Sequence, residues 1–144
     1  MGYTPLADVR KFHETFAPQQ RQDDFLTITE RRINLIYEEY EEVSEAIVHL
    51  EDTRLNLTSS TMEEAKEELA KELADLLYVV YGTAEELGIP LERVFKSVHQ
   101  SNMSKVWSDG TVRRNDFGKI LKPDTYSPPD LSFIHDDRFL PPIS

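Results

Sequence analysis

The segment from about Thr29 to Leu50 has the repeat of an amphipathic helix, and the same segment is crowded with carboxylates. Its apolar positions recur at alternating spacings of three and four, as on a helix with one buried face: Ile33, Ile36, Tyr40, Val43, Ile47 and Leu50. Five glutamates occupy eight consecutive positions, "EEYEEVSE". Like charges three and four residues apart on a helix repel one another. These acids therefore either face water or share a cation.

Helical phase separates the glutamates into two groups, because each residue turns by about 100° around the axis. Measured from Ile36, Glu39 falls at about −60°, inside the apolar sector. Glu42 lies at the edge of that sector, one turn further on. Glu38 is adjacent to this pair but turned outward, and two further glutamates point to water: Glu41 and Glu45.

A second long helix is predicted to begin at a capping box formed by Ser60 and Glu63 and to end at Gly88. Its apolar stripe consists of Ala65, Leu69, Leu73, Leu76, Val80 and Leu87. Glu72 falls inside this stripe and Asp75 at its edge. The other acids of its first turns are expected to face water: Glu63, Glu64 and Glu67. Each long helix thus presents an acid pair at i, i+3 on its core face.

Four carboxylates brought together in a helical core would repel and lose solvation unless a cation compensated them. Carboxylate oxygens are preferred ligands of Mg²⁺ and Mn²⁺, and residues three apart on a helix can reach one ion. The pattern predicts a divalent-cation site formed by Glu39, Glu42, Glu72 and Asp75. The chain has no cysteine, so thiolate metal sites and disulfides are excluded.

The remaining chain adds two shorter helices and an extended end. Thr4-Pro5 predicts a helix to about Phe16, and Pro90 begins another. The inward positions of that last helix are expected to be Leu91, Val94, Phe95 and Val98. "SDG" indicates a tight turn, and proline punctuates the sequence from Lys122 onward. We predict one all-α domain over 1–144, an antiparallel bundle of about four helices with its core at about 29–106, followed by a turn and an extended, proline-containing C-terminal tail at 107–144.

Charge is distributed unevenly along the chain. The net charge of −11 argues against a nucleic-acid partner. Residues 30–75 hold fourteen acids against five bases, whereas residues 92–122 hold seven bases against three acids. A polyphosphate complexed with a divalent cation needs both kinds of charge. No segment has the length of a membrane span or the layout of a signal peptide, so no membrane partner and a cytoplasmic location are expected.

Three motifs in this order resemble the all-α NTP pyrophosphatases, the MazG-like and phosphoribosyl-ATP pyrophosphohydrolase-like group. "EEYEEV" resembles the EExxE signature of that group, "ELAD" its ExxD, and "SNMSK" its later asparagine and lysine. The resemblance spans about 33–130, and "GKILKP" with "PPDL" is similar to a MazG-like branch with dUTPase activity.

The resemblance implies an Mg²⁺-dependent enzyme, with Mn²⁺ as an alternative, that cleaves a nucleoside triphosphate between the α and β phosphates. It implies that Glu39, Glu42, Glu72 and Asp75 hold the metal and that Glu38 and Glu39 take part in catalysis. It implies substrate contacts from Asn102, Lys105, Lys119 and Lys122. It also implies a homodimer or homotetramer, and a role in house-cleaning of the nucleotide pool.

The preferred base stays open, with dUTP, dCTP, damaged nucleotides and phosphoribosyl-ATP as candidates. The last of these is the least expected, because that subgroup is usually shorter and lacks the C-terminal motifs. Four aromatic residues are candidates for stacking on a base: Tyr78, Tyr81, Trp107 and Tyr126. The main alternative interpretation is that the chain is a non-catalytic helical interaction module. A di-iron bundle is disfavoured, because no histidine follows an acid at the spacing of three that its motif requires.

Overall fold

The computed structural model describes residues 4–135 of the 144-residue chain. These residues contain four α-helices: α1 (Pro5–Phe16), α2 (Phe25–Arg54), α3 (Met62–Glu86) and α4 (Leu91–Met103). Two 3₁₀ helices, η1 (Pro18–Gln22) and η2 (Ser132–His135), complete the regular elements. Within the described range there is no strand, only an isolated bridge between Arg114 and Ile120. The all-α prediction is confirmed.

The described residues divide into two compact units, 4–87 and 88–135. Helices α1, α2 and α3 form the first unit, and α4 with the following chain forms the second. Each unit is described by itself below. The expectation of a single domain over 1–144 stays a prediction.

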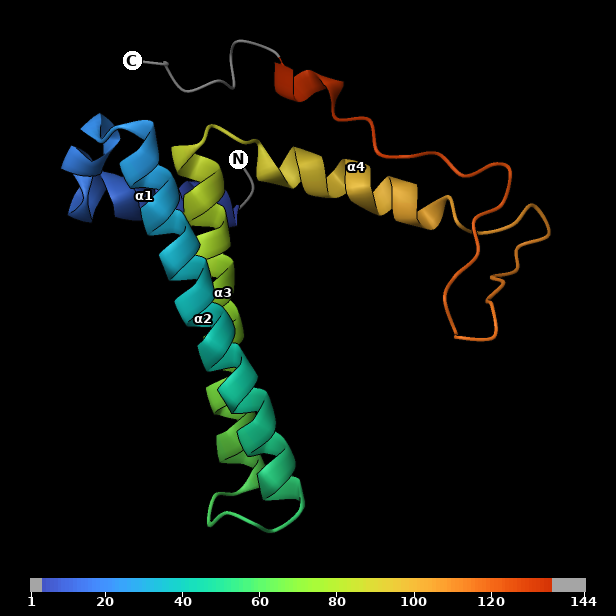
Figure 1. The fold of residues 1–144 in the computed structure, drawn as a ribbon, viewed down its shortest axis with the longest axis horizontal. Coiled ribbons are helices and arrows are strands. Elements are labelled where there is room, and N and C mark those ends of the chain that lie inside the picture. The colour runs from blue at the N-terminus through green and yellow to red at the C-terminus, as the bar shows by residue number, and fades with distance from the viewer. Residues whose placement is uncertain (1–3, 136–144) are drawn as a thin grey trace. The chain divides into compact units, whose positions relative to one another are not determined.

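Helices α2 and α3 form a long antiparallel hairpin and lie side by side along their length (Figure 1). Asp24 caps α2 by accepting a 2.9 Å hydrogen bond from the backbone N–H of Thr27, so the helix begins earlier than the apolar repeat alone predicts. The capping box of α3 is formed by Thr61 and Glu64, and the prediction of Ser60 with Glu63 is wrong by one position. Thr61 Oγ1 accepts from the N–H of Glu64 at 3.2 Å, and Glu64 Oε2 accepts from the N–H of Thr61 at 2.8 Å.

The face of α2 that packs on α3 is rotated relative to the predicted seam. Val43 and Ala46 are buried on it, with 7% and 2% of their surface exposed. Three of the six predicted seam residues are exposed in the single chain: Ile33, Tyr40 and Ile47. The buried face is centred about −60° from Ile36, which is the position of Glu39. Helix α2 therefore has two adjacent apolar faces, which the sequence repeat merges into one, and only one of them is covered by α3.

Helix α3 shows the same division. Ala65 of its predicted stripe is fully buried, whereas Leu73 is 46% exposed. Leu77, which follows Leu73 by one turn, is 57% exposed. The prediction that Leu73 faces the core of this chain is wrong, because that side of α3 lies beyond the contact with α2.

Helix α1 packs on α3 through a network of buried polar side chains. His13 Nδ1 lies 3.0 Å from Glu85 Oε2, and its other ring nitrogen lies 3.5 Å from the Arg32 guanidinium. Arg32 of α2 pairs with Glu86 of α3. Gly82 leaves room for this arrangement, since a Cβ there would meet Arg32 Nη1 at 2.6 Å. Charged groups thus join the three helices α1, α2 and α3.

In the second unit the chain after Lys122 runs back along α4 as a strap, which we define as residues 122–133. Ser104 Oγ accepts from the N–H of Ser127 at 3.0 Å, and Ser97 Oγ donates to the carbonyl of Asp130 at 2.8 Å. The extended, proline-containing tail is therefore fastened to the helix within the described residues, and positions 136–144 of the predicted tail lie outside them. "SDG" forms the predicted tight turn, with Gly110 at a φ of 81°. The inward prediction for Phe95 is wrong for the single chain, where it is 70% exposed, because the strap packs on other positions of α4.

Candidate metal centre

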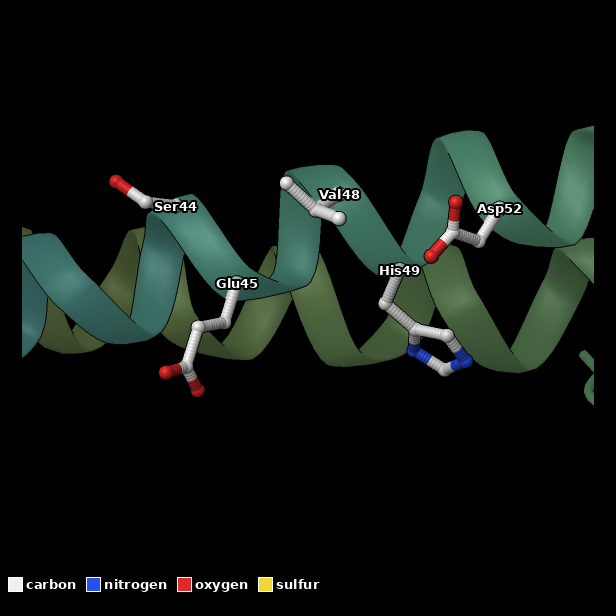
Figure 2. A pocket seen from close by; sticks show the side chains of 5 residues that line it. All are labelled: Ser44, Glu45, Val48, His49 and Asp52. Carbon is white, nitrogen blue, oxygen red and sulfur yellow. The ribbon is translucent and has the colours of Figure 1, made fainter.

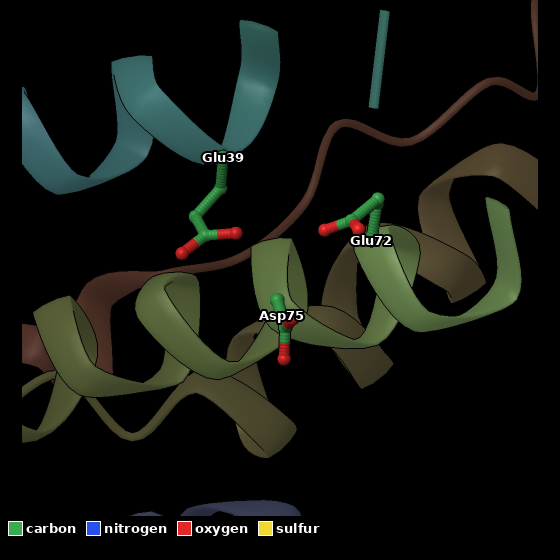
Figure 3. A group of neighbouring side chains, drawn as sticks. All are labelled: Glu39, Glu72 and Asp75. Atoms are coloured by element: carbon green, nitrogen blue, oxygen red, sulfur yellow. The ribbon is translucent and has the colours of Figure 1, made fainter. Parts of the chain in front are cut away.

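Three acids of the two long helices converge at one place in the hairpin. Glu39 of α2 and Glu72 and Asp75 of α3 each offer a carboxylate oxygen, and these oxygens lie within 4.8 Å of one another. Figure 3 shows Glu39 extending from α2 toward the turn of α3 that carries the other two. Among residues 4–135 this is the one group of three acidic or histidine side chains whose ligand atoms come so close.

Glu39 occupies the middle of the packed face of α2, where one of its two carboxylate oxygens is shielded from solvent. Its Oε2 atom is buried and has no hydrogen-bond partner. Burial raises the pKa of Glu39, and the neighbouring charges of Glu42 and Asp75 raise it further. An unpartnered carboxylate oxygen at an interhelical contact is costly without a compensating cation.

The fourth predicted ligand stands beside the cluster. Glu42 lies one turn after Glu39, and its pKa is raised by partial desolvation and by the adjacent Glu72 carboxylate. Glu38 is exposed, but its charge contributes to the raised pKa values of both Glu39 and Glu42. The charges of the other four predicted acids thus all help to raise the pKa of Glu39.

A lysine that the sequence did not single out lies against the same acids. Lys71 Nζ lies 2.8 Å from Asp75 Oδ2 and 3.1 Å from both carboxylate oxygens of Glu72. The hydrogen bond to Asp75 and, next in size, the hydrogen bonds to Glu72 raise the pKa of Lys71. Because a lysine next to acids on an exposed helix usually forms a surface ion pair, sequence alone gave no reason to place it in the site.

The remaining acids of the glutamate run lie where helical phase predicts. Glu41 and Glu45 are exposed. Glu45 lines a shallow hollow of about 360 Å³ that is formed only by residues of α2. Figure 2 shows the side chains that line it: Ser44, Glu45, Val48, His49 and Asp52. A depression formed by the outer surface of one helix brings no group from α3 toward a ligand, so we assign no chemistry to it.

In the second unit, three of the predicted substrate-binding residues gather around Tyr126. Lys105 Nζ donates a 2.8 Å hydrogen bond to Asn102 Oδ1. Lys122 Nζ lies 4.4 Å from the centre of the Tyr126 ring. A hydrogen bond with Ser101, followed by the charges of Lys122 and Lys105, lowers the pKa of Tyr126. The strap therefore brings Lys122 to the same end of α4 as Asn102 and Lys105.

The other predicted residues have different surroundings. Lys119 is exposed in the turn that the bridge between Arg114 and Ile120 closes. Tyr78 makes an edge contact with Phe12 of α1, which is a packing role. The Cζ atom of Arg113 lies over the Trp107 ring, 3.9 Å from its centre. Tyr126, held by Ser101, is the stacking candidate that lies among the cations.

The acid cluster fits a hard divalent cation. It offers oxygen ligands from two helices, one of them buried and unpartnered, and no sulfur or imidazole ligand. That donor set suits Mg²⁺ or Mn²⁺ better than zinc or iron.

The family model described as phosphoribosyl-ATP pyrophosphohydrolase matches residues 9–102. This stretch is well over half of the chain and includes all five acids. The chain belongs to this family. It is therefore a pyrophosphohydrolase of the MazG-like all-α superfamily, whose members cleave phosphoanhydride bonds and typically depend on a divalent metal.

Membership in the pyrophosphohydrolase family confirms the resemblance inferred from the motifs and leaves the dUTPase-like branch as a prediction. The match ends at Asn102, so Lys105, Lys119 and Lys122 lie outside it. The comparison with curated proteins found no match. No helix in residues 4–135 is long and apolar enough to cross a membrane.

Proposed function

We propose that this pyrophosphohydrolase is an Mg²⁺-dependent enzyme, with Mn²⁺ as an alternative, that cleaves a nucleoside triphosphate between its α and β phosphates. The products are a nucleoside monophosphate and pyrophosphate. The observation that carries the proposal is the convergence of Glu39 with Glu72 and Asp75, together with the buried, unpartnered Oε2 of Glu39.

In this proposal Glu39, Glu42, Glu72 and Asp75 hold the metal, and Glu38 and Glu39 orient the attacking water. The bound metal supplies polarisation of the phosphorus centre and lowers the pKa of the water. The desolvated position of Glu39 favours its role as a ligand, because a carboxylate with few competing hydrogen bonds gains most from a cation.

Substrate binding is assigned to Asn102, Lys105, Lys119 and Lys122. Asn102, Lys105 and Lys122 lie around Tyr126, so the positive charges of the two lysines are concentrated at one end of α4. Cations of this kind stabilise the charge that moves onto the leaving pyrophosphate. Tyr126 offers an aromatic ring beside them.

We propose dUTP as the preferred substrate and house-cleaning of the cytoplasmic nucleotide pool as the role. The support is the pair of C-terminal motifs, of which "GKILKP" supplies Lys119 and Lys122. Phosphoribosyl-ATP is the second candidate, since the matching family model carries that name.

The test is a panel of canonical and modified nucleoside triphosphates plus phosphoribosyl-ATP, each with Mg²⁺, with Mn²⁺ or with EDTA. We expect nucleoside monophosphate and pyrophosphate to form in equal amounts, and to form only when a divalent metal is present. Turnover should be fastest with dUTP. Release of inorganic phosphate in place of pyrophosphate would contradict cleavage between the α and β phosphates. No turnover of any substrate would favour the non-catalytic interaction module.

We propose a homodimer or homotetramer assembled through an uncovered apolar face of the hairpin, defined as Ile33, Tyr37, Tyr40 and Ile47 of α2 with Leu73 and Leu77 of α3. Each of these side chains is between 46% and 67% exposed in the single chain. A hollow of about 500 Å³ beside them is lined by apolar residues of both helices. Helical phase puts this face on the side of the hairpin opposite to the acids. A second copy could cover it and leave the metal centre open.

Leu77→Glu is expected to shift the protein toward the monomer, because it would bury an unpaired charge between two copies. Light scattering coupled to gel filtration measures the mass. The matched control is Leu57→Glu, which changes a 70% exposed leucine in the α2–α3 loop and should keep the wild-type assembly. A monomeric wild-type protein would refute the proposed assembly.

A further inference from the structure

Lys71 is the cation that the structure places on the metal-binding acids. Its ammonium contacts Asp75 at 2.8 Å and both oxygens of Glu72 at 3.1 Å. The same carboxylates belong to the group whose oxygens converge within 4.8 Å. Two of the three converging acids are therefore paired with a positive charge that belongs to the chain itself.

The packing of α3 does not require this position of the lysine. The Lys71 side chain is 65% exposed, whereas that of Glu72 is 14% exposed. Lys71 lies at about −140° from Leu76, beyond Asp75 and away from the centre of the α2 contact. The ammonium reaches the acids from the solvent side, on a flexible stem that can also extend into water.

Glu39 is not engaged in the same way. Lys71 makes hydrogen bonds to Glu72 and Asp75 and none to Glu39, whose Oε2 keeps no partner. A single ammonium has one charge and three donors, which its contacts with Glu72 and Asp75 use. The Lys71 ammonium therefore offsets part of the negative charge of the cluster and leaves Glu39 Oε2 without a hydrogen-bond partner.

We propose that Lys71 is a tethered counter-ion of the metal centre: it holds Glu72 and Asp75 in the metal-free protein and gives them up when a divalent cation binds. The inference rests on the proposed metal-dependent function. Lys71 is thus a positioning residue that weakens metal affinity while it prevents the carboxylates from repelling one another in the absence of metal.

The physical reason is competition for the same oxygens. An ammonium and a divalent cation cannot share the Glu72 oxygens at contact distance without strong repulsion, so binding of the metal requires Lys71 to withdraw. The affinity observed for the metal is then reduced by the fraction of molecules in which the lysine occupies the acids. Exposed ion pairs are individually weak, and two of them correspond to a reduction of about threefold to tenfold.

Binding of Mn²⁺ alone, followed by electron paramagnetic resonance of the free ion, tests this inference without any substrate. We expect Lys71→Ala and Lys71→Gln to bind Mn²⁺ about threefold to tenfold more tightly than the wild type. Lys71→Arg should restore an affinity close to that of the wild type, because it keeps a cation within reach of both acids. The matched control is Lys66→Ala, which removes the same charge from the exposed surface of α3 on another face.

Thermal melts give a second measurement. In EDTA the midpoint of Lys71→Ala should lie below that of the wild type, because the acids lose their counter-ion. Excess Mn²⁺ should raise the midpoint of the variant by more than it raises the wild type, since tighter binding to the folded state stabilises it more. Lys66→Ala should show the wild-type increase.

Three results would overturn the inference. Unchanged Mn²⁺ affinity in Lys71→Ala, with a higher KM for substrate, would mean that the lysine serves the phosphates. Equal tightening in Lys71→Ala and Lys66→Ala would mean a general effect of charge. Absence of Mn²⁺ binding in the wild type would refute the proposed metal centre itself, and the inference with it.

Discussion

Glu72→Gln is expected to abolish the metal-dependent release of pyrophosphate while the hairpin stays folded. Glutamine keeps the size and helix propensity of glutamate but removes one anionic ligand from the converging group. The metal would lose affinity and position together, so kcat/KM should fall by at least about 100-fold. Pyrophosphate release at saturating substrate over a range of Mg²⁺ measures the loss, and circular dichroism checks the fold.

Two further variants test whether the loss of pyrophosphate release is specific to the proposed metal ligands. Glu45→Gln makes the same chemical change on the outer surface of α2 and should keep wild-type activity. Lys105→Ala should lower kcat/KM but keep the wild-type affinity for Mn²⁺, because the lysine is proposed to contact substrate and not metal. Equal damage from Glu45→Gln and Glu72→Gln in folded proteins would contradict the division of the glutamates by helical phase.

Helical phase predicted the acid cluster because Glu39 and Glu72 interrupt apolar stripes, where a charge has no ordinary reason to lie. The same reasoning failed for the extent of the packed faces. Ile33, Tyr40 and Ile47 follow the spacing of a core seam and yet are exposed. A sequence records that a position is apolar but not which neighbour covers it. The face that packs on α3 and the adjacent exposed face therefore appear as one apolar stripe.

Two other kinds of contact could not be predicted from the sequence: those made by long, flexible side chains and those between residues far apart in the chain. The contact of Lys71 with Asp75 depends on the direction of a long side chain, which spacing does not fix. The strap along α4 depends on pairs such as Ser97 with Asp130, separated by 33 positions in the chain. The prolines predicted an extended tail but carry no information about what the tail packs against.

The buried polar network of α1 was also invisible to patterns of apolar residues, because it is built from charged side chains. Arg32 lies inside the sector of α2 that faces α3, but a lone arginine at such a position usually extends to solvent. Here its surface is only 5% exposed. Its partner Glu86 is also almost fully buried, with 7% of the side chain exposed.

Arg32→Met is expected to lower the free energy of unfolding by about 2–3 kcal/mol, the largest stability effect among the surface and core changes considered for this chain. Removing one partner of a buried ion pair leaves the other charge desolvated, which is usually more costly than the pair was favourable. Arg31 still contacts Glu86 at 2.7 Å and retains part of the compensation, so the loss should fall below that for a fully isolated charge. At roughly 2–4 °C per kcal/mol for a chain of this size, the thermal midpoint should fall by about 4–12 °C.

The matched control is Arg54→Met at the other end of α2, where the guanidinium is 60% exposed and pairs with Glu51 within one turn. Exposed pairs contribute little, so the midpoint of this variant should stay close to that of the wild type. Hydrogen exchange gives a second measurement, because Arg32→Met should increase exchange in α1, which Arg32 reaches through His13. An unchanged midpoint for Arg32→Met, with α1 exchanging as in the wild type, would show that apolar contacts such as that of Phe12 with Tyr78 hold α1 in place without the charged network.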